Sequence, residues 1–158
     1  MTRDPLTIYL HDHHAAGSAG TALAERFATH ASSGLDRAVL ARIADEVAQD
    51  LRTLEAVMQE RGVRRSRAKD GIALVGERLG RLKANGRLLR RSRLADVIEA
   101  ETLLVGITGK EALWRSLALA FPADADAYEA LAGRARVQRD TISDVRTVAV
   151  RNAFEIKR

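Results

Sequence analysis

Histidines and acidic residues are the side chains of this sequence that could carry metal or acid–base chemistry. The densest group lies in the stretch YLHDHHAAGSAG, residues 9–20, where His11, His13 and His14 flank Asp12. Imidazoles and carboxylates are metal ligands, and a histidine beside a carboxylate is a common general base. The stretch is therefore part of a metal site, a catalytic base with its acid, or a helix with polar residues on its solvent side.

The composition predicts helices as the elements that position these side chains. Of the 158 residues, 46% are hydrophobic, 30% are charged and only two are prolines. Alanine and leucine dominate the hydrophobic share and favour helices. We expect a single all-α domain over residues 1–158, with helices at about 5–31, 35–61, 92–121 and 124–154. Pro5 suits a helix start, Ser92 an N-cap, Gly62 a helix end, and Pro122 the end of the third helix.

Several protein classes are excluded or disfavoured by composition. The sequence has no cysteine, which excludes disulfides, thiolate metal sites and thiol nucleophiles. No apolar run approaches the roughly 18–20 residues that a membrane span requires. The first residues, MTRDPLTIYLHDHH, lack the apolar core of a secretory signal. We therefore expect a cytoplasmic protein without a membrane partner.

Positive charge is concentrated between the second and third helices. Residues 61–93 contain twelve lysines and arginines and two acidic residues, a net charge of +10, whereas the rest of the chain carries −5. We expect a basic crossover over residues 62–91 with a short helix at about 68–83. Two hairpins joined by one long connection are typical of a ferritin-like four-helix bundle.

The crossover could bind nucleic acid or another anionic partner, with Arg64, Arg65, Arg90 and Arg91 as the anion-binding candidates. The segment has no aromatic residue on which bases could stack, and it matches no nucleic-acid-binding module. The acidic remainder of the chain offers another role, because the segment could lie over its own helices. The pattern favours this second interpretation, and nucleic acid stays an alternative.

Helical phase separates the polar residues by direction. At about 100° per residue, His13 falls on the apolar side of the first helix, whereas His11 and His14 do not. The same projection places Asp50 inside the apolar face of the second helix and Glu101 at the centre of the third. On the fourth helix Gln138 is central, with Arg146 close beside it.

The distances of the polar residues from the two helix–helix turns predict two acid–base pairs. If the first turn centres near residues 32–33, His13 and Asp50 lie at the same level. If the second turn centres near residue 123, Glu101 and Arg146 are level as well. Such pairs fix helix register in most proteins, whereas convergence of the four side chains would make a polar pocket in the bundle core.

A standard di-iron centre is not expected. Such bundles use a Glu-x-x-His motif on each of two helices, and no glutamate here is followed three residues later by histidine. All four histidines lie on the first helix, and we expect no cofactor. A mononuclear metal site or an acid–base enzyme remains an alternative. The ligands of that metal site would be His13, Glu46, Asp50 and Glu101.

The third helix is apolar on two sides. Leu103, Ile107 and Trp114 lie opposite the face that contains Leu94, Val105 and Leu119. Either residues 68–83 or a second subunit would cover the second stripe. This pattern predicts a homodimer.

Four stretches together resemble a family of short, uncharacterised bacterial helical proteins with a ferritin-like bundle. They are YLHDHHAAGSAG (9–20), GERLGRLKANG (76–86), EAETLLVGITGKEALW (99–114) and GRARVQRD (133–140). The resemblance spans nearly the whole chain and emphasises Asp12, His13, Lys83, Glu101, Lys110, Trp114 and Gln138. The missing Glu-x-x-His motifs depart from metal-binding ferritin-like proteins, which argues against oxidase or iron-storage activity.

These observations favour a non-enzymatic binding or interaction protein. Its expected polar core consists of His13, Asp50, Glu101, Arg146 and Gln138. The alternatives are a metal-dependent or acid–base enzyme that uses the His13, Asp50 and Glu101 core, and binding of nucleic acid or another anionic partner through residues 61–93.

Overall fold

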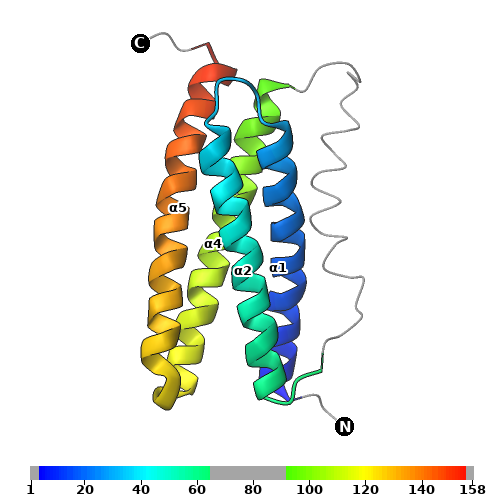
Figure 1. Cartoon of the computed structure of the whole chain (residues 1–158), viewed down its shortest axis with the longest axis vertical. Coiled ribbons are helices and arrows are strands. Elements are labelled where there is room, and N and C mark those ends of the chain that lie inside the picture. Colours follow the sequence, from blue (N-terminus) through cyan, green and yellow to red (C-terminus); the bar gives the residue numbers. More distant parts are fainter. Residues whose placement is uncertain (1–3, 65–91, 156–158) are drawn as a thin grey trace.

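The computed structural model describes residues 4–64 and 92–155, which form four long α-helices and no strand. The helices are α1 (Pro5–His30), α2 (Arg37–Glu60), α4 (Arg93–Ala120) and α5 (Ala125–Ala153), with a 3-10 turn at Pro122–Asp124 (Figure 1). The all-α class is confirmed. The expected helix at 68–83 and the candidates Arg65, Arg90 and Arg91 lie outside the described residues. None of the described helices combines the length and the hydropathy that a membrane crossing requires.

Side-chain caps and a turn glycine set the ends of the helices. The side chains of Asp4, Asp36 and Ser92 accept hydrogen bonds from backbone N–H groups in the first turns of α1, α2 and α4. These groups have no partner within a helix, so each cap removes an unsatisfied donor. After α2, Gly62 adopts a φ of 70°, a left-handed conformation that a residue with a Cβ adopts at a cost. The expected N-cap and helix stop are therefore found at Ser92 and Gly62.

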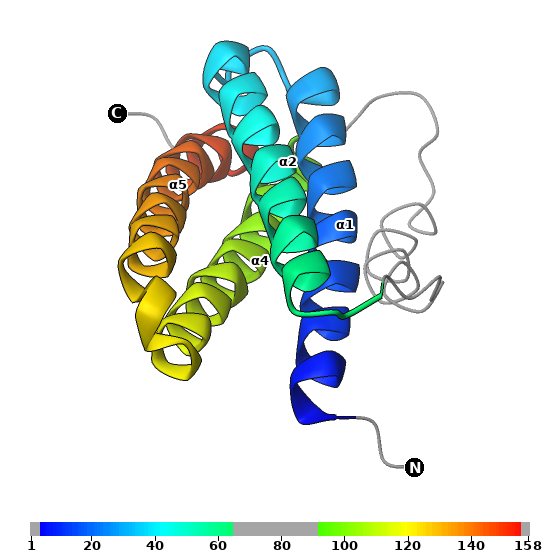
Figure 2. The ribbon, with the colours of Figure 1, turned by 60° about the horizontal axis from the view of Figure 1, so that its bottom comes forward.

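The four helices form two antiparallel hairpins that lie against each other. One hairpin is α1–α2 and the other is α4–α5, and α1 also packs along α4 (Figure 2). The apolar core has two clusters. The cluster near the α1–α2 turn surrounds Phe27 and Ile43, and the second surrounds Met58 and Trp114. On α2, Asp50 lies between these clusters, so a buried acid occupies the middle of the bundle.

The face of α4 that meets the core is opposite to the predicted one. Leu103, Ile107 and Trp114 are at most 3% exposed, whereas Val105 is 65% and Leu119 is 85% exposed. The prediction was wrong because the true core face also carries charged residues. The buried residues Asp96, Glu99 and Glu111 all belong to it, and their charges made that face resemble a solvent-exposed one.

This correction changes which apolar stripe of α4 is left uncovered, and the expected homodimer stays a prediction. The stripe formed by Leu103, Ile107 and Trp114 packs within the chain and needs no second subunit. The exposed apolar residues of α4 lie on its other side.

Candidate functional site

Asp50 is the centre of a buried polar cluster between α2, α4 and α5. Its carboxylate is 2% exposed. Oδ2 accepts a hydrogen bond from Lys110 Nζ at 2.5 Å and another from Gln138 Nε2 at 3.1 Å. Oδ1 accepts a hydrogen bond from Arg134 Nη2. One buried carboxylate thus joins three of the four helices.

Gln138 completes this cluster, and its side chain is fully buried. Its Oε1 accepts a hydrogen bond from Lys110 Nζ at 2.5 Å, and its Nε2 donates to Glu46 Oε2 at 3.1 Å as well as to Asp50. Both ends of the amide are therefore satisfied. Arg134 also reaches Gln49, because its Nη1 donates to Gln49 Oε1 at 3.2 Å.

Helix spacing explains why these side chains meet. Glu46 and Asp50 are four residues apart on α2, and Arg134 and Gln138 are four apart on α5. Residues four apart lie on the same side of a helix. Lys110 extends from α4 between these two pairs. We call Glu46, Asp50, Lys110, Arg134 and Gln138 the polar cluster.

Burial changes the proton affinity of Lys110. Desolvation disfavours its charged form and lowers the pKa from 10.5 to about 8, while the negative charge of Glu46 opposes this shift. A lysine with this pKa carries a reactive neutral amine at a pH close to neutral. The Lys110 side chain is 15% exposed, and its Nζ donates hydrogen bonds to Asp50 and Gln138.

His13 does not meet Asp50. Its ring packs edge-on against Tyr9, with the centroids 4.5 Å apart, and desolvation lowers its pKa below 6.5 while Asp12 opposes the shift. The expected pairing was wrong because the α1–α2 turn centres near Gly34. Gly17 lies against Leu51 in the structure. These two residues are equally far from Gly34 along the chain, which places the centre of the turn there. Moving that centre by one to two residues changes the residue of α2 that lies opposite a given residue of α1 by two to four positions, or about one helical turn.

The other histidines of the opening stretch tie α1 to the end of α2. His11 Nε2 donates to the carbonyl oxygen of Arg64 at 2.7 Å, and His14 Nε2 lies 3.1 Å from Glu55 Oε1. Their partners, Arg64 and Glu55, both line one hollow at the end of α2, whereas His13 packs on Tyr9. The stretch therefore does not form one site.

Glu101 and Arg146 pair with each other, but at the surface. Arg146 Nε donates to Glu101 Oε1 at 2.8 Å, and their side chains are 41% and 47% exposed. The level relationship expected from the second turn is present in the structure. The placement of these two residues in the polar core was wrong, since the face of α4 that carries Glu101 points to solvent.

Three buried acidic residues of α4 were missed from the sequence. Glu111 is 5% exposed and is surrounded by the guanidinium groups of Arg115, Arg136 and Arg139. Asp96 accepts from the backbone N–H of Ser32, and Glu99 pairs with Arg26. A sequence signal for them exists. Because α4 is apolar on two opposite sides, either side can face the core, and the acidic residues next to Leu103, Ile107 and Trp114 are then candidates for burial.

The alternative metal ligands do not converge. Glu46 and Asp50 both contact Gln138, whereas His13 packs on Tyr9 and Glu101 pairs with Arg146. In residues 4–64 and 92–155, no group of three or more histidine, aspartate and glutamate side chains could hold a metal ion.

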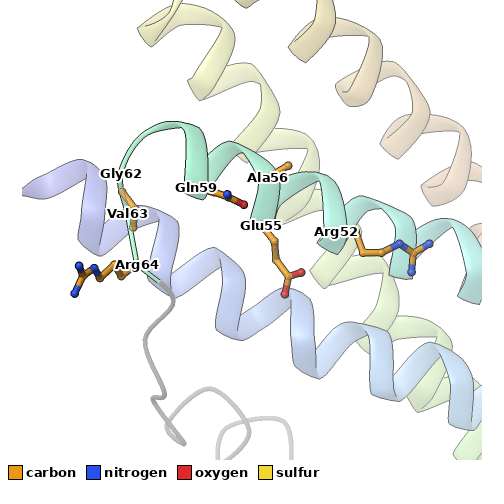
Figure 3. A pocket seen from close by; sticks show the side chains of 7 residues that line it. All are labelled: Arg52, Glu55, Ala56, Gln59, Gly62, Val63 and Arg64. Carbon is orange, nitrogen blue, oxygen red and sulfur yellow. The ribbon is translucent and has the colours of Figure 1, made fainter.

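A shallow hollow lies away from the polar cluster, on the outer side of the α2 C-terminus (Figure 3). Glu55 points from α2 toward α1 there, while the Arg64 side chain points away from the hollow. Its lining residues are Arg52, Glu55, Ala56, Gln59, Gly62, Val63 and Arg64.

Comparison of the chain with protein-family models, with curated proteins and with solved structures gave no match.

Proposed function

We propose that this chain is a non-enzymatic binding or interaction protein built on a ferritin-like four-helix bundle. One observation carries the proposal: both carboxylate oxygens of the buried Asp50 are already occupied by Lys110, Arg134 and Gln138. A group that acts on a substrate needs a free reacting atom within hydrogen-bond reach of it. The polar cluster therefore serves the fold, and binding takes place at the surface.

The energetics of buried ion pairs support this role. A buried pair adds little net stability, but it disfavours helix arrangements that would leave one partner alone. Asp50 joins α2 to both helices of the other hairpin, so a sliding or rotated hairpin would lose at least one of its partners. We infer that the polar cluster selects one packing of the two hairpins.

Amine labelling of Lys110 tests the non-enzymatic part of the proposal. The full-length protein receives pulses of acetic anhydride at pH 9, where the neutral amine of Lys110 predominates, and peptide mapping gives the rate for this residue. We expect Lys110 to react at least about a hundredfold slower than in urea-unfolded protein, since its side chain is mostly buried and its Nζ is held by Asp50 and Gln138. Equal rates in the folded and unfolded protein would favour the alternative of acid–base or covalent chemistry at Lys110.

A second candidate function is binding of an anionic partner through residues 61–93. The observation that favours it is the net charge of +10 in this segment. Arg64, the last described residue before the remainder of the segment, is exposed. Nucleic acid is one such partner, and its binding would weaken steeply with salt because each neutralised phosphate releases a counterion.

Fluorescence anisotropy with a labelled DNA duplex tests this second function. The test variant replaces Arg64, Arg65, Arg90 and Arg91 with glutamine. The control variant makes the same change of charge at Arg42, Arg52, Arg146 and Arg151. Specific use of the segment predicts at least about tenfold weaker binding and a shallower salt dependence in the test variant alone. Equal affinities of the two variants would contradict it.

A further inference from the structure

The outward face of α4 exposes several large apolar side chains. Leu94, Val105 and Leu119 are 45%, 65% and 85% exposed. They lie on the side opposite Leu103 and Ile107, which pack in the core. With spacings of three, four or seven residues, the outward face comprises Leu94, Ile98, Glu101, Val105, Thr108, Ala112 and Leu119. Arg115 borders the same face between Ala112 and Leu119, so Glu101 and Arg115 are its two charges. A helix face with this many exposed apolar residues marks a contact surface rather than a solvated one.

Glycines beside this face leave room for another backbone. A Cβ added at Gly106 or Gly109 would meet nothing within 4 Å. A glycine inside a helix costs about 1 kcal/mol relative to alanine. Gly109 lies about 60° from the middle of the outward face, where a closely approaching second helix would meet it, whereas Gly106 lies about 120° away on the flank of α4.

We propose that the outward face of α4 packs in antiparallel orientation against the same face of a second copy of this chain. A twofold axis near Gly106 gives a register in which the two faces match. Leu94 of one copy then lies opposite Leu119 of the other, and Val105 lies opposite Thr108. The two exposed leucines are thereby paired at both ends of the contact, and the shorter side chains of Val105 and Thr108 meet at its middle.

Charge complementarity supports this register. Helical side chains lean toward the N-terminus of their own helix. In the antiparallel register, the side chain of Glu101 in one copy and that of Arg115 in the second copy therefore extend toward each other. Both side chains are 47% exposed and so accessible to a partner. The contact would add to the pairs that each residue makes within its own chain, with Arg146 and Glu111 respectively.

The antiparallel arrangement is preferred over a parallel one for the same reason. A parallel twofold pair of α4 helices would place Glu101 opposite its own copy, and two like charges at that distance repel. The face is about 38 Å long and about 10 Å wide, or on the order of 400 Å² on each copy. This is half of the roughly 800 Å² per partner that stable interfaces bury, so we expect a weak dimer.

Cysteine crosslinking tests both the surface and the register, because the sequence has no cysteine of its own. Val105→Cys should form a disulfide-linked dimer on mild oxidation, since its copy lies within about one helical turn. Leu94→Cys alone should not, because the two copies of that position are about 38 Å apart. The Leu94→Cys, Leu119→Cys double variant should crosslink. Equal crosslinking of both single variants, or of neither, would overturn the proposal.

Sedimentation equilibrium of the same full-length chain supplies the second test. We expect association to increase with protein concentration and Val105→Glu to weaken it at least about tenfold. Val137→Glu is the matched control, because Val137 is 61% exposed on α5, on the side from which Arg134 reaches α2. A monomer at every concentration, or equal loss in both variants, would overturn the proposed dimer.

Charge reversal separates the antiparallel register from other uses of the same face. Glu101→Arg or Arg115→Glu alone should weaken the dimer, whereas the double variant should recover most of the lost affinity. Circular dichroism of each variant checks that the helices are intact. A double variant weaker than either single variant would exclude the register.

Discussion

Lys110 Nζ lies 2.5 Å from Asp50 Oδ2, and the two residues belong to different hairpins of the bundle. The contact is nearly closed to water, since the Lys110 side chain is 15% exposed and Asp50 is 2% exposed. Around it, Gln138 donates to the same carboxylate oxygen and Arg134 donates to the other. The stability of the fold should therefore depend on this one acid more than on any pair at the surface.

Asp50→Ala is expected to lower the free energy of unfolding by about 3–5 kcal/mol, because it leaves the Lys110 ammonium and the Arg134 guanidinium without their buried counter-charge. Urea denaturation followed by circular dichroism measures the loss. Glu101→Gln is the matched control at low protein concentration, since its ion pair with Arg146 is exposed and contributes about 0–1 kcal/mol. Equal losses in both variants would contradict the central role of Asp50. Adding Lys110→Met to Asp50→Ala should recover part of the loss.

The titration of Lys110 should increase the free energy of unfolding as the pH rises from about 8 to 10.5. Burial lowers its pKa to about 8 in the folded chain, whereas the unfolded lysine keeps its proton up to about 10.5. In this window unfolding takes up a proton at this residue, so a higher pH opposes unfolding. The slope is at most about 1.4 kcal/mol per pH unit. Thermal melts of the wild type and of Lys110→Met across this range isolate the contribution, which the variant should lack.

The helices were predictable because their ends depend on local signals. Ser92 caps α4 and Gly62 follows α2 in a left-handed conformation, and both residues could be recognised without tertiary information. The inward positions of Asp50 and Gln138 were also predictable, since the helices that carry them have one clear apolar face.

The partners of these residues were not predictable from one sequence. The apolar pattern of α4 fits two opposite faces, so the phase that turns Lys110 inward and Glu101 outward is decided only by packing against the other helices. The level of His13 depends on the centre of the α1–α2 turn, and an error of one or two residues there is enough to replace Asp50 with another neighbour.

The titration of His13 should decrease the free energy of unfolding as the pH drops below 6.5. Desolvation of its ring holds the folded pKa below the ordinary value of 6.5, so the unfolded chain binds the proton more tightly in this range. Acidification therefore favours unfolding at this residue. His13→Phe keeps an aromatic ring against Tyr9 and removes the titration. The difference in stability between the wild type and this variant should shrink or reverse as the pH falls, and a difference that is constant with pH would contradict the prediction.

Glu111→Gln should destabilise the protein by about 1–3 kcal/mol, and the loss should shrink in salt. The Glu111 carboxylate is buried beneath Arg115, Arg136 and Arg139 and is the acceptor that their guanidinium groups share. Without its charge, three positive groups face one another, and their repulsion is screened as ionic strength rises. Urea denaturation at low and at high sodium chloride concentration measures both effects. Asp140→Asn is the control, because Asp140 is 67% exposed and pairs with Arg139 alone among the described residues. A loss in Glu111→Gln that does not change with salt would show that the side chain acts through packing and hydrogen bonding instead of through its charge.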